Sequence, residues 1–376
     1  MYDCIIVGAG PAGSTVAYHL AKQGHTVLLL EQAVLPRYKP CSGALSPSVA
    51  QWFDFDLAPG LELTTRKLRY TWKLEDEVCA ELKTQEPIWL VRRDVFDQFL
   101  VTQAQGAGAE VRDQTPVTGI ALQGDHWQVH VPGETLECQY LVGADGATGP
   151  MAKWLGFPEQ KLRTAAILEV DADGPVVDSF ALNFEFGLAK NACIWGFPRQ
   201  QGYTFGIVNF LGGKIKDLHA PLRDYAQGLG IDPAQGQEYT HLVKLWDGHQ
   251  PLHCDRALLV GEAGAIVDPL TAEGIRPGVF SGVKAAAAIH QALGGEANAL
   301  AQYTEIIQQE WGNDMQWAQR IASVFYRVPG IAYRVGVKRP TATERLGQLL
   351  TGDIRYGDIA NRVIKRLSTG LLPGRR

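Results

Sequence analysis

The sequence contains no long apolar segment and no excess of positive charge. None of its apolar runs approaches the roughly 18 residues that are needed to cross a bilayer. Its 376 residues include 35 basic and 40 acidic side chains, which gives a formal net charge of −5. The first absence argues against a membrane-spanning protein, and the second argues against a nucleic-acid-binding protein. Internal repeats and low-complexity segments are also absent, and the length suits two domains or one elaborated domain.

The cysteines lack the spacing of a metal site or a disulfide framework. Six of them are scattered along the chain at positions 4, 41, 79, 138, 193 and 254, and no two form a CxxC pair. The first apolar run begins at Cys4 and has the pattern of a strand within the fold, not of a signal peptide. We therefore expect free thiols, no metal site and a cytoplasmic protein.

Basic residues collect towards the C-terminus. Residues 331–376 contain ten basic and three acidic side chains, a formal charge of +7, which leaves −12 for the rest of the chain. Ile359, Val363, Ile364 and Leu367 would share one stripe of a helix in this region. Two interpretations stay open: a solvated helix that closes a domain, or a peripheral contact between the basic C-terminal region and a membrane surface.

Residues 3–31 follow the order strand, glycine turn, helix, strand and acidic residue. The turn is Gly8-Ala9-Gly10-Pro11-Ala12-Gly13, with a helix predicted over 12–23 and a strand over 25–30. In such a unit the first glycine permits the tight turn, the second admits a pyrophosphate, and the third packs the helix on the strand. The helix N-terminus faces the phosphates, and Glu31 is placed to accept a hydrogen bond from a ribose hydroxyl. This pattern predicts a dinucleotide-binding site.

Two later strands also run into glycine-rich turns. The first turn is Gly143-Ala144-Asp145-Gly146, and the second is Gly261-Glu262-Ala263-Gly264, ahead of a helix predicted over 277–293. Between them, alternating apolar and polar residues predict an antiparallel sheet over about 164–239. Trp195 and Phe197 would lie on one face of this sheet, which lines either an apolar cavity or an ordinary sheet core.

The loop at 35–45 joins two prolines, two basic residues, Cys41 and Gly43 within eleven residues. A loop directly after a cofactor-binding unit often carries function. Gly43 permits close backbone approach to a flat ligand. Cys41 is the only nucleophilic or redox-capable side chain of the loop, and it is either functional or a passive small residue.

Taken in order, these motifs resemble those of the aromatic-hydroxylase-like superfamily of FAD-dependent oxidoreductases, and Arg93-x-x-Phe96-Asp97 is similar to its arginine position near FAD. Within that superfamily, 36–43 and 268–275 resemble segments of the geranylgeranyl reductase family. The run at 195–198 with Gly206 resembles its YxWxFP…GxG element. The resemblance covers nearly the whole chain. Several positions depart from the family's pattern, namely Ser42, Cys193, Val208, Glu262 and Ala272.

The motifs and the resemblance together assign the following residues. FAD is the implied cofactor, and its predicted contacts are Gly8, Gly10, Pro11, Ala12, Gly13, Glu31, Gln32, Ser42, Gly43, Ala44, Arg93, Val117, Asp145, Gly146, Gly261, Glu262, Pro269, Glu273, Gly274 and Ile275. Cys41 is the candidate catalytic residue beside the flavin. Trp195, Phe197 and Pro198 are expected to contact the substrate.

The predicted fold class is α/β with an α+β insert. It comprises a Rossmann-like FAD-binding domain of the glutathione-reductase-like βαβ type, an inserted antiparallel β-sheet substrate domain and a C-terminal helical region. The FAD-binding domain is expected to be discontinuous, with residues 1–63, 84–163 and 251–298. The substrate domain takes 64–83 and 164–250, and the helical region takes 299–376.

The resemblance implies an FAD-dependent reductase that adds a hydride and a proton to isolated double bonds of a geranylgeranyl or other prenyl chain. The chain would belong to a lipid, a quinone or a chlorophyll-type substrate. Only one dinucleotide fingerprint is present, so electrons are expected from transiently bound NADPH or from ferredoxin. The alternatives are an FAD-dependent monooxygenase, a halogenase and a non-catalytic FAD protein that carries or senses a prenyl lipid.

Overall fold

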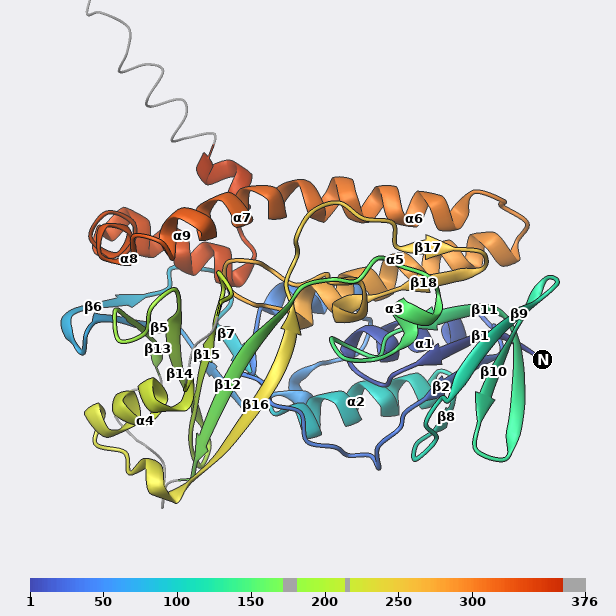
Figure 1. Ribbon diagram of the computed structural model, residues 1–376, viewed down its shortest axis with the longest axis horizontal. Coiled ribbons are helices and arrows are strands. Elements are labelled where there is room, and N and C mark those ends of the chain that lie inside the picture. The colour runs from blue at the N-terminus through green and yellow to red at the C-terminus, as the bar shows by residue number, and fades with distance from the viewer. Residues whose placement is uncertain (172–180, 214–216, 361–376) are drawn as a thin grey trace, which may run out of the picture.

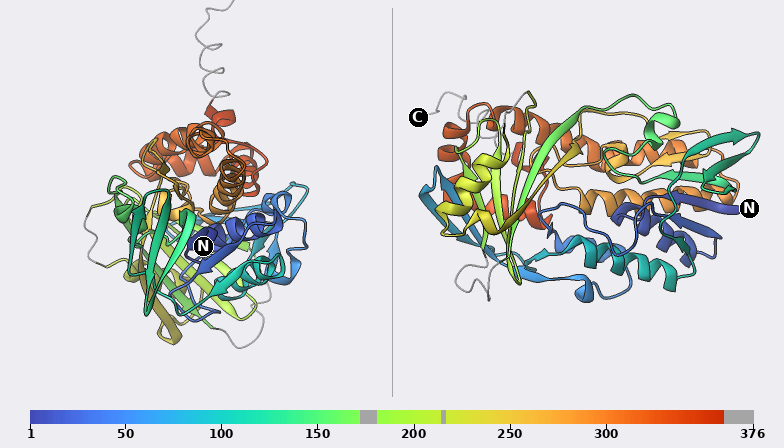
Figure 2. Two further views of the ribbon diagram at one scale, coloured as in Figure 1. Left: turned by 90° about the vertical axis from the view of Figure 1, so that its right-hand side faces the viewer. Right: turned by 60° about the horizontal axis from the view of Figure 1, so that its bottom comes forward.

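The computed structural model describes residues 1–171, 181–213 and 217–360. Figure 1 shows a parallel sheet with its helices at one end of the molecule and a second sheet at the other. A layer of C-terminal helices runs along the top of both, and the N-terminus lies at the end of the molecule away from the second sheet (Figures 1 and 2).

The first sheet is built on five parallel strands. Their order runs β18-β11-β1-β2-β8, with the short β17 antiparallel at one edge and the pair β9 and β10 extending from β11. The bounds are β1 Tyr2–Val7, β2 Val27–Leu30, β8 Glu110–Arg112, β9 Gly119–Gln123, β10 His126–Val131, β11 Glu134–Gly143, β17 His253–Cys254 and β18 Ala257–Leu259.

Three helices accompany this sheet, and their residues form one apolar core with β1 and β2. The helix predicted after the glycine turn is α1 (Pro11–Lys22), which packs against α2 (Arg93–Gly106) and α5 (Ile275–Leu293). The short helix α3 (Met151–Trp154) follows β11, and a 3₁₀ turn over Gly261–Gly264 follows β18. The predicted boundaries of α1 and β2 are one or two residues away from the observed ones.

The second sheet has seven strands in the order β16-β12-β15-β14-β13-β5-β6. Its strands from β12 to β16 pair antiparallel, as predicted for 164–239, and β13 also pairs in parallel with β5 from outside that span. Helix α4 (His219–Gly228) packs on this sheet, and a small sheet of β3, β7 and β4 lies apart from it. The bounds are β3 Ala44–Leu45, β4 Leu63–Thr65, β5 Lys67–Trp72, β6 Glu75–Glu81, β7 Ile88–Leu90, β12 Leu162–Val170, β13 Ala181–Phe186, β14 Cys193–Arg199, β15 Gly202–Val208 and β16 Gly236–Lys244.

The C-terminal helices are α6 (Ala299–Ile307), α7 (Asn313–Phe325), α8 (Pro329–Ala332) and α9 (Pro340–Thr351), with π-helical turns over Gln308–Gly312 and Tyr333–Val337. Helix α8 begins at Pro329 and α9 begins at Pro340. Proline lacks an amide hydrogen, which costs nothing at a helix start because the first amides of a helix have no intrahelical acceptor. The predicted stripe through Val363, Ile364 and Leu367 lies outside the described residues. Within the described ones, none of the helices combines the length and apolarity needed to span a membrane.

These elements confirm the predicted fold class. The division into domains at the stated boundaries stays a prediction. The glycine turn also behaves as its spacing predicts, because helix α1 approaches β1 more closely than a side chain would allow. A Cβ atom on Gly13 would lie 2.0 Å from the carbonyl oxygen of Gly8 and 3.1 Å from the Cβ of Ala144.

We expect Gly13→Ala to lower the free energy of unfolding by about 1–3 kcal/mol, because α1 must move away from β1 to admit the methyl group. Chemical denaturation of the variant measures the change. Gly106→Ala is the matched control, since that helical glycine is exposed and has open space around it. Equal stabilities of the two variants would contradict the close packing of α1 on β1.

Candidate functional site

A single cavity of about 1300 Å³ extends between the two sheets. Its volume exceeds the roughly 300–1,000 Å³ that is typical of a pocket for one small molecule. One end is lined by the glycine turns of the first sheet, and the other by aromatic and aliphatic side chains of the second sheet and of α7 and α9. The cavity therefore has room for a large cofactor at one end and an apolar ligand at the other.

The cavity brings together most of the residues that the sequence assigned to a site. Seventeen of the twenty predicted cofactor contacts line it, as do Cys41, Trp195 and Phe197. Gly13, Gly43, Pro269 and Pro198 do not. Gly43 has a positive φ of 78°, and a Cβ there would lie 2.3 Å from the carbonyl oxygen of Val91. The close backbone approach that requires Gly43 is thus made to Val91, the residue that follows β7.

Two helices begin at the cavity with no side-chain cap. Gly10 precedes α1 and Gly274 precedes α5, and the first residues of both helices line the cavity. The first amide groups of a helix have no intrahelical acceptor and carry partial positive charge. These two helix starts are suited to an anionic or carbonyl oxygen of a ligand, which fits the pyrophosphate and the ring carbonyl groups of FAD.

Glu31 lies at the end of β2 with part of its hydrogen-bonding capacity free. Its Oε2 atom accepts from the amide of Ala9 (3.1 Å) and from Nε of Arg37 (2.9 Å), and its Oε1 atom accepts from the amide of Ala33 (3.1 Å). An ionised carboxylate offers about four acceptor positions. Among the described residues, one acceptor position on Oε1 therefore has no partner, and the hydrogen bond from a ribose hydroxyl to Glu31 stays a prediction.

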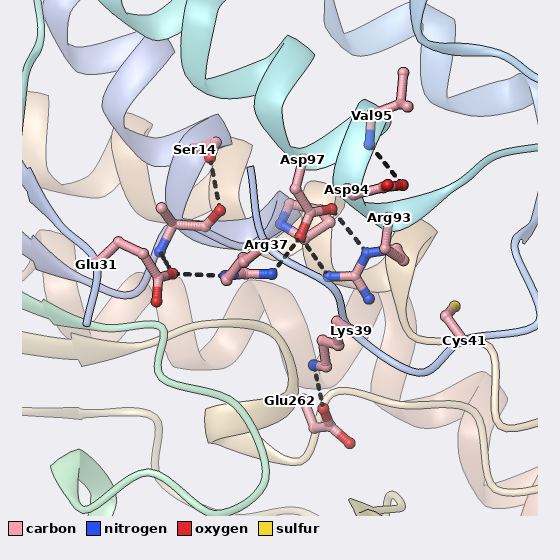
Figure 3. A network of polar contacts seen from close by, with 12 residues as sticks. Ser14, Glu31, Arg37, Lys39, Cys41, Arg93, Asp94, Val95, Asp97 and Glu262 are labelled. Carbon is pink, nitrogen blue, oxygen red and sulfur yellow. Dashed lines mark hydrogen bonds and ion pairs between the residues drawn. The ribbon is translucent and has the colours of Figure 1, made fainter. Parts of the chain in front are cut away.

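Arg37 links Glu31 to a second ion pair (Figure 3). Its Nη1 atom lies 3.1 Å from Oδ2 of Asp97, and Arg93 binds both oxygens of Asp97 at 2.7 Å. Burial alone would lower the pKa of Arg93, but the Asp97 carboxylate and, to a lesser extent, the Cys41 side chain raise it above its ordinary value. Arg37 was missed as a site residue, although its place in a short loop with two prolines and a second base was a signal.

A second polar group lies around Glu262, which is part of the 3₁₀ turn that follows β18. Lys39 from the Cys41 loop donates to Oε2 of Glu262 (3.2 Å), and the amide of Lys244 donates to Oε1 (3.3 Å). Nearby Asp145 accepts from the amide of Met151 (2.8 Å), while its buried Oδ1 atom has no partner in the described part of the chain. Burial raises the pKa of Asp145. The unpartnered oxygen is suited to a ligand hydroxyl, and this too fits FAD.

His241 on β16 also lines the cavity, and no sequence motif marked it. Burial lowers the pKa of His241 to about 4, with a smaller lowering by Lys39 and Arg93 that the Glu262 charge opposes. The imidazole is therefore neutral near pH 7 and has both a donor and an acceptor nitrogen. Its Nδ1 atom is buried without a partner in the described structure.

Cys41 lies on the same loop as Arg37 and Lys39 and faces the cavity. Its Sγ atom accepts a hydrogen bond from the amide of Gly43 at 3.4 Å. Arg37 and Lys39 hold this loop to Glu31 after β2, to Asp97 on α2 and to Glu262 on the turn after β18.

Strand β14, which carries both Trp195 and Phe197, forms part of the wall at the apolar end. Trp195 pairs with Gly206 on β15, where a Cβ would lie 2.2 Å from the indole ring. Gly206 therefore makes room for the indole. Phe197 packs edge-on against Phe184 at 5.4 Å. Of the two interpretations that the sequence left open for this face, the structure shows a cavity wall.

The C-terminal helices complete this wall. The predicted helical region had no assigned role, but α7 and α9 contribute apolar side chains to the cavity. Tyr356 also reaches the cavity, and its hydroxyl donates to the buried Asp268 at 2.6 Å. The lining residues from this region include Ile321, Phe325, Tyr326, Leu346, Leu349, Leu350 and Ile359.

Comparisons with known proteins agree with this geometry. Residues 1–187 match the model of the FAD binding domain family. An uncharacterised protein of Methanosarcina barkeri is 30% identical over 297 residues, which cover 78% of this chain and 75% of that protein. The chain belongs to the FAD-dependent oxidoreductases of the aromatic-hydroxylase-like superfamily. FAD is accordingly the cofactor of the family, and the groups at the polar end of the cavity suit it.

Two kinds of relative stand out within this superfamily. A digeranylgeranylglycerophospholipid reductase of Methanocaldococcus jannaschii is 27% identical over 294 residues, 73% of each chain. A tryptophan 2-halogenase of Chondromyces crocatus is 27% identical over 365 residues, 86% of this chain and 67% of that protein. A geranylgeranyl bacteriochlorophyll reductase-like structure from Thermoplasma acidophilum has the same fold, with a TM-score of 0.77, 21% identity and coverage of 93% and 91%.

The ion-pair network predicts a large effect for Asp97→Asn. The substitution leaves two guanidinium groups facing a neutral amide in a site where Asp97 is 1% exposed, so the free energy of unfolding should fall by about 3–5 kcal/mol. Binding of FAD should weaken as well, because Arg37 and Glu31 lose their fixed positions. Denaturation and FAD titration of the refolded apoprotein measure the two effects.

The matched control is Asp94→Asn on the same helix. Asp94 pairs with the exposed Arg92, and such a surface pair contributes no more than about 1 kcal/mol. If Asp97→Asn behaved like Asp94→Asn in both measurements, the buried network would not hold the cofactor site together.

Proposed function

We propose that this protein is an FAD-dependent reductase that saturates isolated double bonds of a geranylgeranyl or related prenyl chain. The observation that carries this proposal is the continuity of the FAD-binding end of the cavity with a long apolar end. A prenyl chain is a hydrocarbon, and only an apolar cavity beside the flavin can hold it near the cofactor. The digeranylgeranylglycerophospholipid reductase among the relatives supports the same choice.

FAD, when bound, supplies the hydride chemistry of this reaction. The residues of the chain bind and orient the two partners. Glu31 and the starts of α1 and α5 hold the cofactor, while Trp195 and Phe197 align the substrate chain. Alignment matters because an isolated double bond is a poor acceptor and reacts only when it is held close to the donor. The cavity wall of aromatic and aliphatic side chains excludes water from the reacting carbons.

The electron donor belongs to the proposal as well. The described structure contains one dinucleotide-binding βαβ unit of the type found at 3–31, which FAD takes. We therefore propose that NADPH binds transiently or that a ferredoxin-type protein delivers the electrons. Substrates on a lipid, a quinone or a chlorophyll-type molecule are all compatible with this cavity.

A halogenase is the second candidate function, since the tryptophan 2-halogenase matches 86% of this chain. Halogenation and monooxygenation by flavin enzymes consume oxygen, whereas double-bond reduction does not. The two classes are thus separated by an experiment without oxygen.

The test uses the purified holoprotein, reduced with dithionite under anaerobic conditions and mixed with geranylgeraniol, geranylgeranyl diphosphate or a geranylgeranyl glycerophospholipid. We expect one of these to reoxidise the flavin and to gain two hydrogen atoms per reduced double bond, as measured by absorbance and mass spectrometry. Reoxidation only after admission of oxygen, with a gain of oxygen or halogen by a substrate, would reject the reductase.

Variants assign the reaction to the cavity. Trp195→Ala should lower the rate of flavin reoxidation by about 10–100-fold, because the chain loses its alignment, while the FAD content stays unchanged. The control Trp52→Ala removes a half-buried tryptophan outside the cavity. Cys41→Ser is compared with Cys79→Ser, an exposed cysteine elsewhere. Unchanged reoxidation in both Trp195→Ala and Cys41→Ser would remove these two residues from the site.

A further inference from the structure

Exposed apolar side chains cluster where α7 ends and α8 begins. Val324, Val328 and Ile331 are 63%, 42% and 64% exposed. The amide of Val328 donates to the carbonyl of Val324 (3.2 Å), and the amide of Ile331 donates to the carbonyl of Val328 (3.1 Å). The three residues therefore follow one another along the turn that joins α7 to α8, and we call them the apolar patch. Their closeness along the chain distinguishes them from the scattered apolar residues that any protein surface contains.

The same stretch is strongly basic, although the whole chain has a net charge of −5. Residues 320–339 contain five basic side chains and no acidic one. Lys338 pairs with Asp76. The exposed Arg327, Arg334 and Arg339 form no ion pair with any residue that the structure describes. Their charges are therefore available to a partner.

This surface is the outer side of the cavity wall. Val324 faces solvent, while its neighbours Ile321 and Phe325 line the cavity from α7. Gly336, from the turn after α8, lines it as well. In Figure 1 the α7–α9 layer lies over the second sheet, with α8 at the end of the molecule opposite the N-terminus. The patch and the apolar end of the cavity are thus separated by one layer of helix.

We propose that the surface formed by residues 320–339 docks on an anionic lipid bilayer. Val324, Val328 and Ile331 enter the interfacial region, and Arg327, Arg334 and Arg339 face the lipid phosphates. Apolar side chains flanked by cations are the combination with which peripheral proteins bind such surfaces. Charge complementarity favours this partner, because the acidic body of the protein is repelled by the bilayer while this stretch is attracted.

Docking in this position brings the apolar end of the cavity to the bilayer, where a prenyl lipid resides. That consequence rests on the proposed function, whereas the docking itself does not. One of the two interpretations that the sequence left open was a membrane contact of the whole basic C-terminal region, including Arg362, Lys365 and Arg366, which lie outside the described residues. The present proposal moves the contact to 320–339.

The test is flotation of the full-length holoprotein with vesicles of phosphatidylcholine alone or with phosphatidylglycerol added. We expect binding to the anionic vesicles that weakens at high salt. Arg327→Gln with Arg334→Gln should weaken this binding by roughly fivefold per charge, and so by about 25-fold together. Val328→Ser with Ile331→Ser should weaken binding at both low and high salt.

Control variants substitute exposed basic and apolar residues that lie outside 320–339. Lys67→Gln with Lys153→Gln removes two exposed bases, and Leu122→Ser removes an exposed apolar residue on β9. If these control variants lost as much vesicle binding as the variants in 320–339, the proposal would be wrong, because binding would then be a property of the whole surface. Loss of binding on substituting only Arg362, Lys365 and Arg366 by Gln would also overturn it.

A further outcome concerns a second copy of the chain. The wild type could fail to float with vesicles and instead be a dimer in light scattering. If the double substitution Val328→Ser with Ile331→Ser dissociates that dimer, the patch is a dimer interface and the membrane proposal is wrong. Because flotation needs no turnover, its failure is independent of the anaerobic reduction experiment. A protein that floats but reduces no prenyl chain would retain the docking surface and lose the proposed reaction.

Discussion

The buried carboxylate of Asp97 is the constraint on which the site depends. It accepts hydrogen bonds from Arg93 on its own helix and from Arg37 on the loop that follows β2, and Arg37 in turn binds Glu31. Two guanidinium groups and two carboxylates thus balance in charge while buried at the end of the first sheet. Such a group is stable only while every member is present. The Cys41 side chain also interacts with Arg93, so the thiol and the Asp97 carboxylate share one guanidinium neighbour.

The two ends of the cavity are built by different kinds of structure. At the polar end the ligand meets backbone, because parallel strands end at one edge of the sheet and the following helices begin there. At the apolar end it meets side chains, because alternate residues of β14 and β15 face the same side of the second sheet. The chain passes between the two sheets from β2 to β5, from β6 to β8, from β11 to β12 and from β16 to β17. Residues of both sheets therefore line one cavity.

The features that the sequence predicted well are the local ones. The spacing of Gly8, Gly10 and Gly13 determines one turn and one helix start, so the pattern can be interpreted without knowing the rest of the fold. The features that the sequence missed join segments that are distant along the chain. Asp97 is 60 residues from Arg37. Strand β5 pairs with β13, although strands β8 to β11 of the first sheet lie between them in the sequence. His241 and the cavity-facing side of α9 were missed for the same reason, since an isolated imidazole or apolar stripe does not reveal what packs against it.

Two departures from the reductase pattern change the volume of the cavity wall in opposite directions. Cys193 stands where that pattern has tyrosine, and Val208 stands where it has glycine. Ile194 and Ile207 are paired across β14 and β15, so Cys193 and Val208 lie at the same end of the cavity wall, and both are buried. One change removes volume and the other adds it, which is the kind of exchange that a packed wall tolerates. The changes also replace a phenol hydroxyl with the less polar thiol of Cys193 and add the aliphatic side chain of Val208, so at this point the wall suits a hydrocarbon better than a polar group.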